Sequence, residues 1–179
     1  MTKLNLNACV LAAWVALAGA ASAQQAAAPA ANPLDVIPDK APFATPYGAP
    51  IPLARAQSAI DAAMAEAVKR GWAMNVAVVD SGANPVAFAR MDGAQLASIA
   101  VAEHKARASA NYRRPTKAFE DGVQKGDFKY LLTLDGIIAS RGGIPLIEDG
   151  KLIGAIGCAG GTGSQDEVVC TAGAATINK

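Results

Sequence analysis

The chain has 179 residues, of which 42 are alanine and 17 are glycine, and only 17% of its residues are charged. This composition excludes a disordered acidic or basic tail, because such segments are rich in charge and poor in apolar residues. Beyond Lys3 the chain has 15 basic and 15 acidic residues, so it lacks the basic balance that is typical of nucleic-acid binding. We expect no nucleic-acid partner.

The first 23 residues have the pattern of a secretory signal peptide. Lys3 precedes an apolar run from Ala8 to Ala20, and Ala21-Ser22-Ala23 is a small-residue cleavage site. The run is shorter than the ~20 residues of a membrane-spanning helix, and we expect no membrane span. We predict cleavage after Ala23 and a mature protein that is periplasmic or secreted.

Residues 24–52 are rich in alanine and proline, and seven of the ten prolines of the chain fall between Pro29 and Pro52. This density disfavours helix and sheet and predicts an extended tether. A single folded domain is then expected over residues 53–179, because a chain of this length can bury one sizeable core.

The first part of this domain predicts a helix followed by a hairpin. The apolar residues of the helix fall at helical spacing, and they are Leu53, Ile60, Met64 and Val68. Gly71 ends this helix. Two short apolar segments follow at 74–79 and 86–91, and the turn residues 80–85 lie between them, which is typical of two antiparallel strands.

The second part predicts three helices and another hairpin, with residues 128–134 ambiguous. The helices are expected over 95–112, 116–123 and 164–177. The hairpin strands are expected over 144–147 and 152–158, and Asp149-Gly150 between them is its strongest turn signal. The order of the elements predicts an α+β fold in which helices flank an antiparallel β-sheet.

The only histidine, His104, lies within the second long helix. Small or apolar residues surround it at helical spacing, and they are Ala97, Ala100, Val101 and Ala108. Such a smooth face can approach a sheet, a neighbouring subunit or a flat cofactor, and histidine is a common ligand of metals and of haem. The alternative is a surface or interface histidine without a ligand.

Basic residues gather around this histidine and after it, and they are Lys105, Arg107, Arg113, Arg114 and Lys117. Arginine binds carboxylates in a bidentate manner, so one or two of these side chains could hold the propionates of a haem or the carboxylate of a small acid. The alternative is a solvated helix end, in which Glu103 and Arg107 form an ordinary i,i+4 pair.

A glycine-rich loop joins the last predicted strand to the last predicted helix. Ser164 and Glu167 fit a capping box at the start of that helix, and free backbone N–H groups there could hold an anion. The candidate anion-binding residues are Gly160, Gly161, Gly163 and Ser164. The phosphate-binding motifs are absent from this loop, so a simple tight turn is the alternative. Asp166 is a candidate acid or base.

Cys158 and Cys170 are the two cysteines outside the predicted signal peptide. An oxidising compartment favours a disulfide between them, whereas two reduced and buried cysteines are the alternative. Their spacing does not match a C-x-x-C redox motif, and two cysteines with one histidine are a poor zinc set.

Several stretches together resemble the GlcG/HbpS family, which includes the C-terminal domain of PduO-type proteins. These stretches are Val78-Val79-Asp80-Ser81-Gly82, His104-Lys105-Ala106-Arg107-Ala108, Gly142-Gly143-Ile144-Pro145-Leu146, Gly154-Ala155-Ile156-Gly157 and Gln165-Asp166-Glu167. The resemblance covers residues 53–177. It implies an antiparallel sheet flanked by helices, similar to the profilin or roadblock layer architecture, and assembly into homo-oligomers.

The resemblance also implies a function. Secreted members of this family bind haem or iron and take part in haem or redox sensing, and other members occur in glycolate or diol pathways. His104 stands at a position that is often acidic in the family, so it is a candidate iron ligand particular to this chain. Thr116 and Met91 are candidate second ligands.

The leading hypothesis is a secreted, homo-oligomeric protein that binds haem as a haem or iron sensor or carrier. In this hypothesis His104 ligates the iron, and the cofactor is bound by residues near it, namely Lys105, Arg107, Arg113 and Arg114. One alternative is an enzyme or accessory protein acting on a small organic acid such as glycolate at the glycine-rich loop. Another is a structural component of an oligomer. We expect a binding protein rather than an enzyme.

Overall fold

The computed structural model describes residues 32, 35–37, 39 and 44–178. The predicted signal peptide, residues 1–23, and the start of the predicted tether lie outside these residues. Within the described part of the chain, no helix has both the length and the apolar character needed to cross a membrane.

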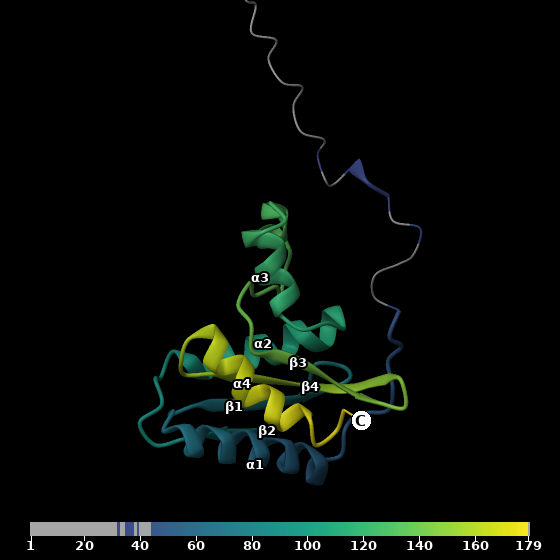
Figure 1. The fold of residues 1–179 in the computed structure, drawn as a ribbon. Coiled ribbons are helices and arrows are strands. Elements are labelled where there is room, and N and C mark those ends of the chain that lie inside the picture. Colours follow the sequence, from purple (N-terminus) through teal and green to yellow (C-terminus); the bar gives the residue numbers. More distant parts are fainter. Residues whose placement is uncertain (1–31, 33–34, 38, 40–43, 179) are drawn as a thin grey trace, which may run out of the picture. The chain divides into compact units, whose positions relative to one another are not determined.

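Helices and strands follow one another along residues 53–174 (Figure 1). In chain order they are α1 (Leu53–Arg70), β1 (Asn75–Asp80), β2 (Pro85–Arg90), α2 (Ser98–Tyr112), α3 (Lys117–Gln124), the 3-10 helix η2 (Lys129–Thr133), β3 (Gly143–Glu148), β4 (Lys151–Ala159) and α4 (Gly163–Ala174). Each predicted helix and strand is present. The largest differences are at helix ends, because α2 begins at Ser98 rather than at residue 95 and α4 ends at Ala174 rather than at residue 177.

The four strands form one sheet in the order β2-β1-β4-β3, and every neighbouring pair is antiparallel. The pairs β1–β2 and β3–β4 are the two predicted hairpins. In the second hairpin Asp149 and Gly150 have φ angles of 49° and 73°, the two positive values that a tight type I′ turn requires. The predicted α+β fold with an antiparallel sheet flanked by helices is confirmed.

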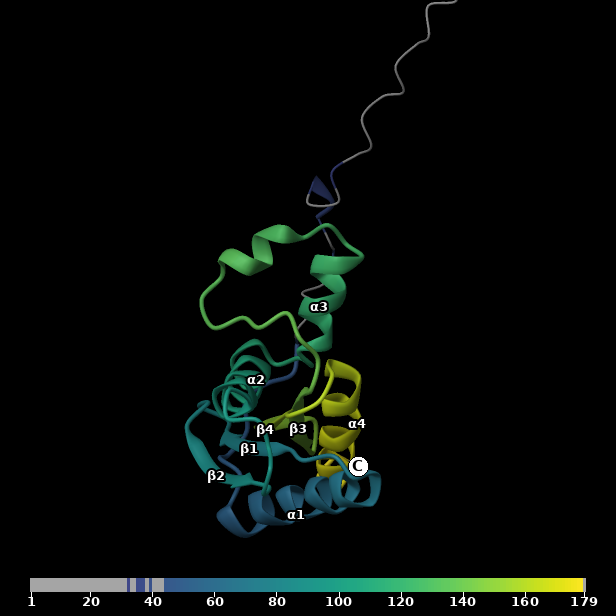
Figure 2. The ribbon, with the colours of Figure 1, turned by 90° about the vertical axis from the view of Figure 1, so that its left-hand side faces the viewer.

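Alternate residues of the central strand β1 face two different helical layers. Val76 and Val78 pack in one core with residues of α1 and α4. Ala77 and Val79 pack in a second core with residues of α2. The sheet therefore lies between α1 and α4 on one side and α2 on the other (Figures 1 and 2).

The buried face of α1 is made mainly of alanine, which differs from the prediction. Leu53 and Val68, which the spacing assigns to the apolar face, are 62% and 65% exposed. The buried residues of α1 are Ala56, Ala59, Ile60, Ala63 and Ala67. Gly173 of α4 lies so close to the carbonyl of Ala59 that a Cβ would not fit between them. Because the two helices approach this closely, small side chains occupy the core face.

The last residues of the predicted tether pair with the sheet. Tyr47 forms a parallel bridge to Leu152 of β4. The Gly48 N–H donates to the Leu152 carbonyl at 2.7 Å, and the Ile51 N–H donates to the Ile153 carbonyl at 2.8 Å. This segment continues the sheet beside β4 past the end of β1, so the packed structure begins before α1.

The edge strand β3 is bonded to a side chain from the C-terminal segment. Asn178 accepts a hydrogen bond at Oδ1 from the Ile147 N–H at 2.7 Å and donates from Nδ2 to the Pro145 carbonyl at 3.0 Å. One side-chain amide thereby satisfies a donor and an acceptor on the outer edge of this strand.

Helix α3 and the 3-10 helix η2 carry a small core of their own beyond the C-terminal end of α2 (Figure 2). Phe119 of α3 and Leu131 of η2 are buried there together with Ala108 of α2. The ring of Tyr112 meets Phe119 edge-on, with ring centres 5.3 Å apart.

Arg141 links α3 to α4 through two carboxylates. Its Nε donates to Glu120 Oε1 and its backbone N–H donates to Glu120 Oε2, both at 2.8 Å. Its Nη1 lies 3.4 Å from Glu167 Oε2. The hydrogen bonds from Arg141 hold the pKa of the Glu120 carboxyl below its ordinary value.

Candidate functional site

Lys105 and Asp166 form a buried ion pair between α2 and α4. Lys105 Nζ lies 2.7 Å from Asp166 Oδ2, and the two side chains are only 1% and 5% exposed. Lys105 Nζ also donates to the Cys158 carbonyl of β4 at 3.2 Å, and the Gly161 N–H donates to Asp166 Oδ1 at 3.0 Å. This pair therefore joins α2, β4 and α4.

Burial has the largest effect on the ionisation of Asp166. It raises the pKa of the Asp166 carboxyl, although Lys105 and the N–H groups of Gly160 and Gly161 favour the ionised form. Removing one partner of a buried pair leaves an uncompensated charge in the interior, which is strongly destabilising. The geometry thus gives Lys105 and Asp166 a role in holding the fold.

Two glycines let the chain pass directly over this ion pair. A Cβ on Gly142 would meet Asp166 Cβ and Lys105 Nζ, and a Cβ on Gly143 would meet the Lys105 carbonyl. Gly142 also has a φ of 110°, in the region that favours glycine. Three of the quoted family stretches therefore converge on one internal contact.

The capping box of α4 lies two residues earlier than predicted. Thr162 and Gln165 form it, not Ser164 and Glu167, because α4 begins at Gly163. The Thr162 N–H donates to Gln165 Oε1 at 2.8 Å, and the Gln165 N–H donates back to Thr162 Oγ1 at 3.4 Å. Glu167 instead faces Arg141.

The glycine-rich loop already holds an internal anion. The Gly161 N–H donates to Asp166 Oδ1 at 3.0 Å, and the Gly160 N–H also favours the ionised form of this carboxylate. Gly163 lies against the side chain of Arg141, and Ser164 is exposed. Two of the four residues that the sequence offers to an external anion therefore face the carboxylate of Asp166, the acid–base candidate.

Cys158 of β4 and Cys170 of α4 are joined by a disulfide, with their Cα atoms 5.6 Å apart. Both residues are fully buried. Cys170 lies four residues after Asp166 on the same face of α4, so the disulfide and the ion pair fasten this helix close together. Of the two states that the sequence left open, the structure contains the oxidised one.

His104 lies on the side of α2 that faces away from the sheet. The helical period places it nearly opposite Ala102 and Ala106, which are fully buried against the sheet. His104 is half-buried. Arg107 pairs with Glu103 at 3.3 Å, as the sequence suggests. The sheet therefore packs against Ala102, Ala106 and Ala110, and not against the predicted smooth face around His104.

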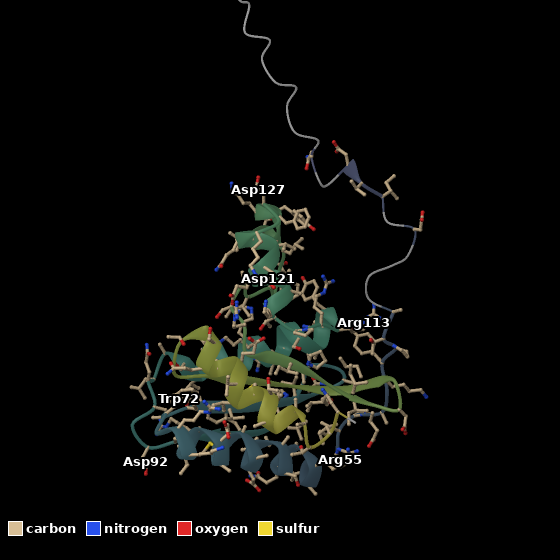
Figure 3. All side chains as sticks on the ribbon, in the orientation of Figure 1. Arg55, Trp72, Asp92, Arg113, Asp121 and Asp127 are labelled. Atoms are coloured by element: carbon tan, nitrogen blue, oxygen red, sulfur yellow. A yellow bond between two sulfur atoms is a disulfide. The ribbon has the colours of Figure 1, made fainter. Side chains whose placement is uncertain are left out.

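Arg113 ends α2 in the left-handed conformation, with a φ of 52°. Its Nη1 donates to the Thr45 carbonyl at 3.0 Å, and its guanidinium carbon lies 5.2 Å from the centre of the Tyr47 ring. The Tyr47 hydroxyl donates to the Asn111 carbonyl at 2.8 Å. Figure 3 shows Arg113 at this end of α2, beside the segment that precedes α1.

Arg114 lies against aromatic rings. Its guanidinium carbon is 5.2 Å from the ring centre of Phe119 and 5.9 Å from that of Tyr112. Burial lowers the pKa of Arg114 to about 10, and the charge of the neighbouring Arg113 acts in the same direction. The side chain is still cationic at neutral pH, so two adjacent cations lie at this end of α2.

A cavity of about 500 Å³ opens beside these two arginines. It is lined by Thr45, Arg113, Arg114, Pro115, Ala118, Ile144, Pro145, Ile147 and Asn178. Most of this wall is apolar, and none of the described residues that line it is acidic. A cavity of this size with a few convergent polar groups is typical of a small-molecule site, and its two guanidinium groups suit a carboxylate.

The cavity gathers only part of the predicted site. Arg113 and Arg114 line it, whereas His104, Lys105 and Arg107 do not. Sequence reasoning missed the rest of the wall, because most of the other residues come from the predicted tether, from β3 and from the C-terminal segment. No spacing in the sequence relates these segments, and only the fold brings them together.

The candidate second ligands have internal partners. Thr116 is fully buried, and its Oγ1 accepts the Gly143 N–H at 2.9 Å. Met91 Sδ accepts the Met74 N–H at 3.3 Å. In the described ranges no group of three or more histidine, cysteine, aspartate or glutamate residues is arranged to hold a metal ion.

Known proteins with related sequences and structures agree on one family. Residues 51–175 match a family described as haem degrading protein HbpS-like. Protein GlcG of Escherichia coli strain K12 is 37% identical over 102 residues, which are 57% of this chain and 75% of that protein.

Two solved structures have the same fold. A double mutant of HbpS from Streptomyces reticuli is 29% identical with a TM-score of 0.67, and the match covers 80% of this chain and 99% of that one. A PduOC:haem complex is 28% identical with a TM-score of 0.66, and the match covers 72% of this chain and 96% of that one. The chain belongs to the HbpS-like family.

Proposed function

We propose that this protein binds haem, and that the cavity at the C-terminal end of α2 receives the propionate side of the cofactor. The observation that carries the proposal is the pair Arg113 and Arg114 at the mouth of an apolar cavity of about 500 Å³, in a family with a member solved as a haem complex.

The residues that line the cavity fit the chemistry of the cofactor edge. Arg113 and Arg114 would bind carboxylates through charge-assisted hydrogen bonds, and Ile144 and Ile147 offer apolar contact to a flat hydrocarbon ring. A bound haem would supply an iron centre able to bind diatomic ligands or change oxidation state. The described lining contains no histidine, cysteine or methionine, so the iron ligand must come from outside the cavity wall.

His104 is the imidazole to test as that ligand. It is the only histidine of the chain, and it precedes Arg113 by nine residues, about 13 Å and two and a half turns along α2, so it stands on the opposite side of the helix from that arginine. The proposed carboxylate contacts of Arg113 and Arg114 and the iron ligand are therefore tested separately.

We further propose where this protein is located and how it assembles. The predicted signal peptide, residues 1–23, would direct the protein to the periplasm or the exterior, where a disulfide such as Cys158–Cys170 is stable. A secreted homo-oligomer that senses or carries haem is consistent with these features. The runner-up is a protein that acts on a small organic acid, whose carboxylate would bind the same two arginines of the cavity.

Titration with hemin, followed by the Soret absorbance, tests the proposal. Arg114→Gln should weaken hemin binding by about tenfold or more, the loss of one charge-assisted hydrogen bond. Arg107→Gln is the matched control, because Arg107 lies on the same helix, pairs with Glu103 and does not line the cavity. Absence of a Soret change in the unmodified protein, or an equal loss in both variants, would contradict the proposal.

His104→Ala tests the iron ligand separately. We expect the Soret band to change in position and intensity while hemin is still bound, because the carboxylate contacts remain. An unchanged spectrum would exclude His104 as the iron ligand and leave the cavity assignment standing.

A further inference from the structure

The segment 45–51 borders the cavity through Thr45, although all but its last residue precede the part of the chain that matches the family. Hydrogen bonds hold it against β4: the Leu152 N–H donates to the Pro46 carbonyl at 2.8 Å, and the Gly48 N–H donates to the Leu152 carbonyl at 2.7 Å. Its backbone is therefore fixed by the sheet, and Thr45 lines the cavity from this side.

Tyr47 connects this segment to the arginine at the end of α2. Its hydroxyl donates to the Asn111 carbonyl at 2.8 Å, so the ring is tied to the last turn of the helix. The guanidinium of Arg113 lies over that ring at 5.2 Å and donates to the Thr45 carbonyl at 3.0 Å. The ring and the carbonyl together restrict where the guanidinium can lie.

A cation can select a carboxylate only where it is held in place. A free arginine side chain has many rotamers, and ordering it on binding lowers affinity. The contact with Tyr47 restricts the side chain before a ligand arrives. Only one Nη of Arg113 is used by Thr45, and a guanidinium has five N–H donors, so it retains donors for a second acceptor.

We propose that Tyr47 is a positioning residue that orients Arg113 in the cavity, and that this contact makes the site selective for ligands that carry a carboxylate. The inference rests on the proposed function of the cavity as a site for an amphipathic anion. It adds that Tyr47 sets the preference for the carboxylate of the ligand. Tyr47 acts through Arg113 and need not touch the ligand itself.

Two probes test this inference on three single variants and one double variant. Hemin and hemin dimethyl ester have the same ring and iron, and only hemin carries free carboxylates. The unmodified protein should bind hemin at least about tenfold more tightly than the ester. Tyr47→Leu removes the aromatic face and should lower this preference by about three- to tenfold, through weaker hemin binding with little change for the ester.

Tyr47→Phe separates positioning from packing. It keeps the ring under Arg113 and removes only the hydroxyl, so the preference for hemin should stay closer to that of the unmodified protein. In an Arg113→Gln background, Tyr47→Leu should have no further effect on the preference, because the residue it positions is absent. Unfolding midpoints of all variants show whether each of them folds.

The outcomes distinguish this inference from the function on which it rests. If the unmodified protein binds neither probe, the proposed function and the positioning role both fail. If it binds hemin but Tyr47→Leu weakens both probes equally, or if Tyr47→Leu acts fully without Arg113, the cavity assignment stands and the positioning role is overturned. If Tyr47→Leu does not fold, an unchanged preference in Arg113→Gln overturns the positioning role, because the residue that Tyr47 is proposed to position would then have no part in the preference.

Discussion

The ion pair Lys105–Asp166 and the cavity lined by Arg113 and Arg114 differ in what surrounds their positive charges. At the first, a lysine is enclosed and neutralised by an aspartate of the same chain. At the second, two guanidinium groups border an apolar cavity whose described lining contains no acidic residue. The first arrangement stabilises the fold, whereas the second is the site that we propose for a ligand.

The family stretches quoted above lie at the first of these two regions more than at the second. Lys105, Gly142, Gly143 and Asp166 all belong to those stretches, and they meet at the enclosed pair. Arg113 and Arg114 lie outside the quoted stretches, and most of the cavity wall does as well. In this chain the stretches that identify the family therefore lie at an internal ion pair rather than at the proposed ligand site.

Substitution at the enclosed pair should have the strongest effect on stability. Lys105→Met should lower the free energy of unfolding by about 3–5 kcal/mol, because Asp166 would stay buried without its cation. Urea unfolding followed by circular dichroism measures this loss. The double variant Lys105→Met/Asp166→Leu removes both charges and should regain much of the stability. A double variant no more stable than the single one would contradict the idea that the unpaired charge causes the loss.

The disulfide should contribute less than the ion pair that it accompanies. Replacing both Cys158 and Cys170 by alanine should lower the free energy of unfolding by about 2–3 kcal/mol, since a bridge across 12 residues mainly restricts the unfolded chain. Thermal unfolding with and without a reductant measures it. The reductant should lower the Tm of the unmodified protein and leave that of the double variant unchanged. Equal Tm values of the unmodified protein and the double variant without reductant would contradict a stabilising disulfide.

The smallest effect is expected at the partly exposed contact of Glu120 with Arg141, and it depends on pH. Arg141 lowers the pKa of Glu120 in the folded protein, so the contact stabilises the fold above the unfolded pKa of about 4.3. This contribution is lost as the pH falls through the lowered folded pKa. Unmodified protein should therefore exceed Glu120→Gln in Tm at pH 7, and the difference should shrink steadily as the pH falls below the unfolded pKa. A difference independent of pH would contradict this account.

The sequence predicts the fold well because its signals are local. Gly71 ends α1, and Asp149-Gly150 forms the second hairpin turn, both from residues adjacent to the features they determine. The apolar face of α1 is predicted less well, because Leu53 and Val68 have the right spacing but the close approach of α4 favours alanine. Periodicity does not report the distance between two helices.

The site is predicted only in part, because spacing along the sequence does not show which segments meet in space. Arg113 and Arg114 are visible as a basic pair after a helix, and they do line the cavity. Lys105 belongs to the same basic run, but its position on the sheet side of α2 encloses it with Asp166. Which basic residues stay outside the core depends on the side of α2 that the sheet covers. Thr45 and Asn178 line the cavity from distant parts of the chain.

The side chain of Asn178 has a consequence for association between molecules. An open strand edge can pair with the edge of another molecule and begin aggregation. Asn178 bonds the Ile147 N–H and the Pro145 carbonyl on the outer edge of β3. These two backbone groups are therefore not available to pair with a strand of another molecule. Loss of one amide near the end of the chain would open this edge, and self-association would be its first visible sign.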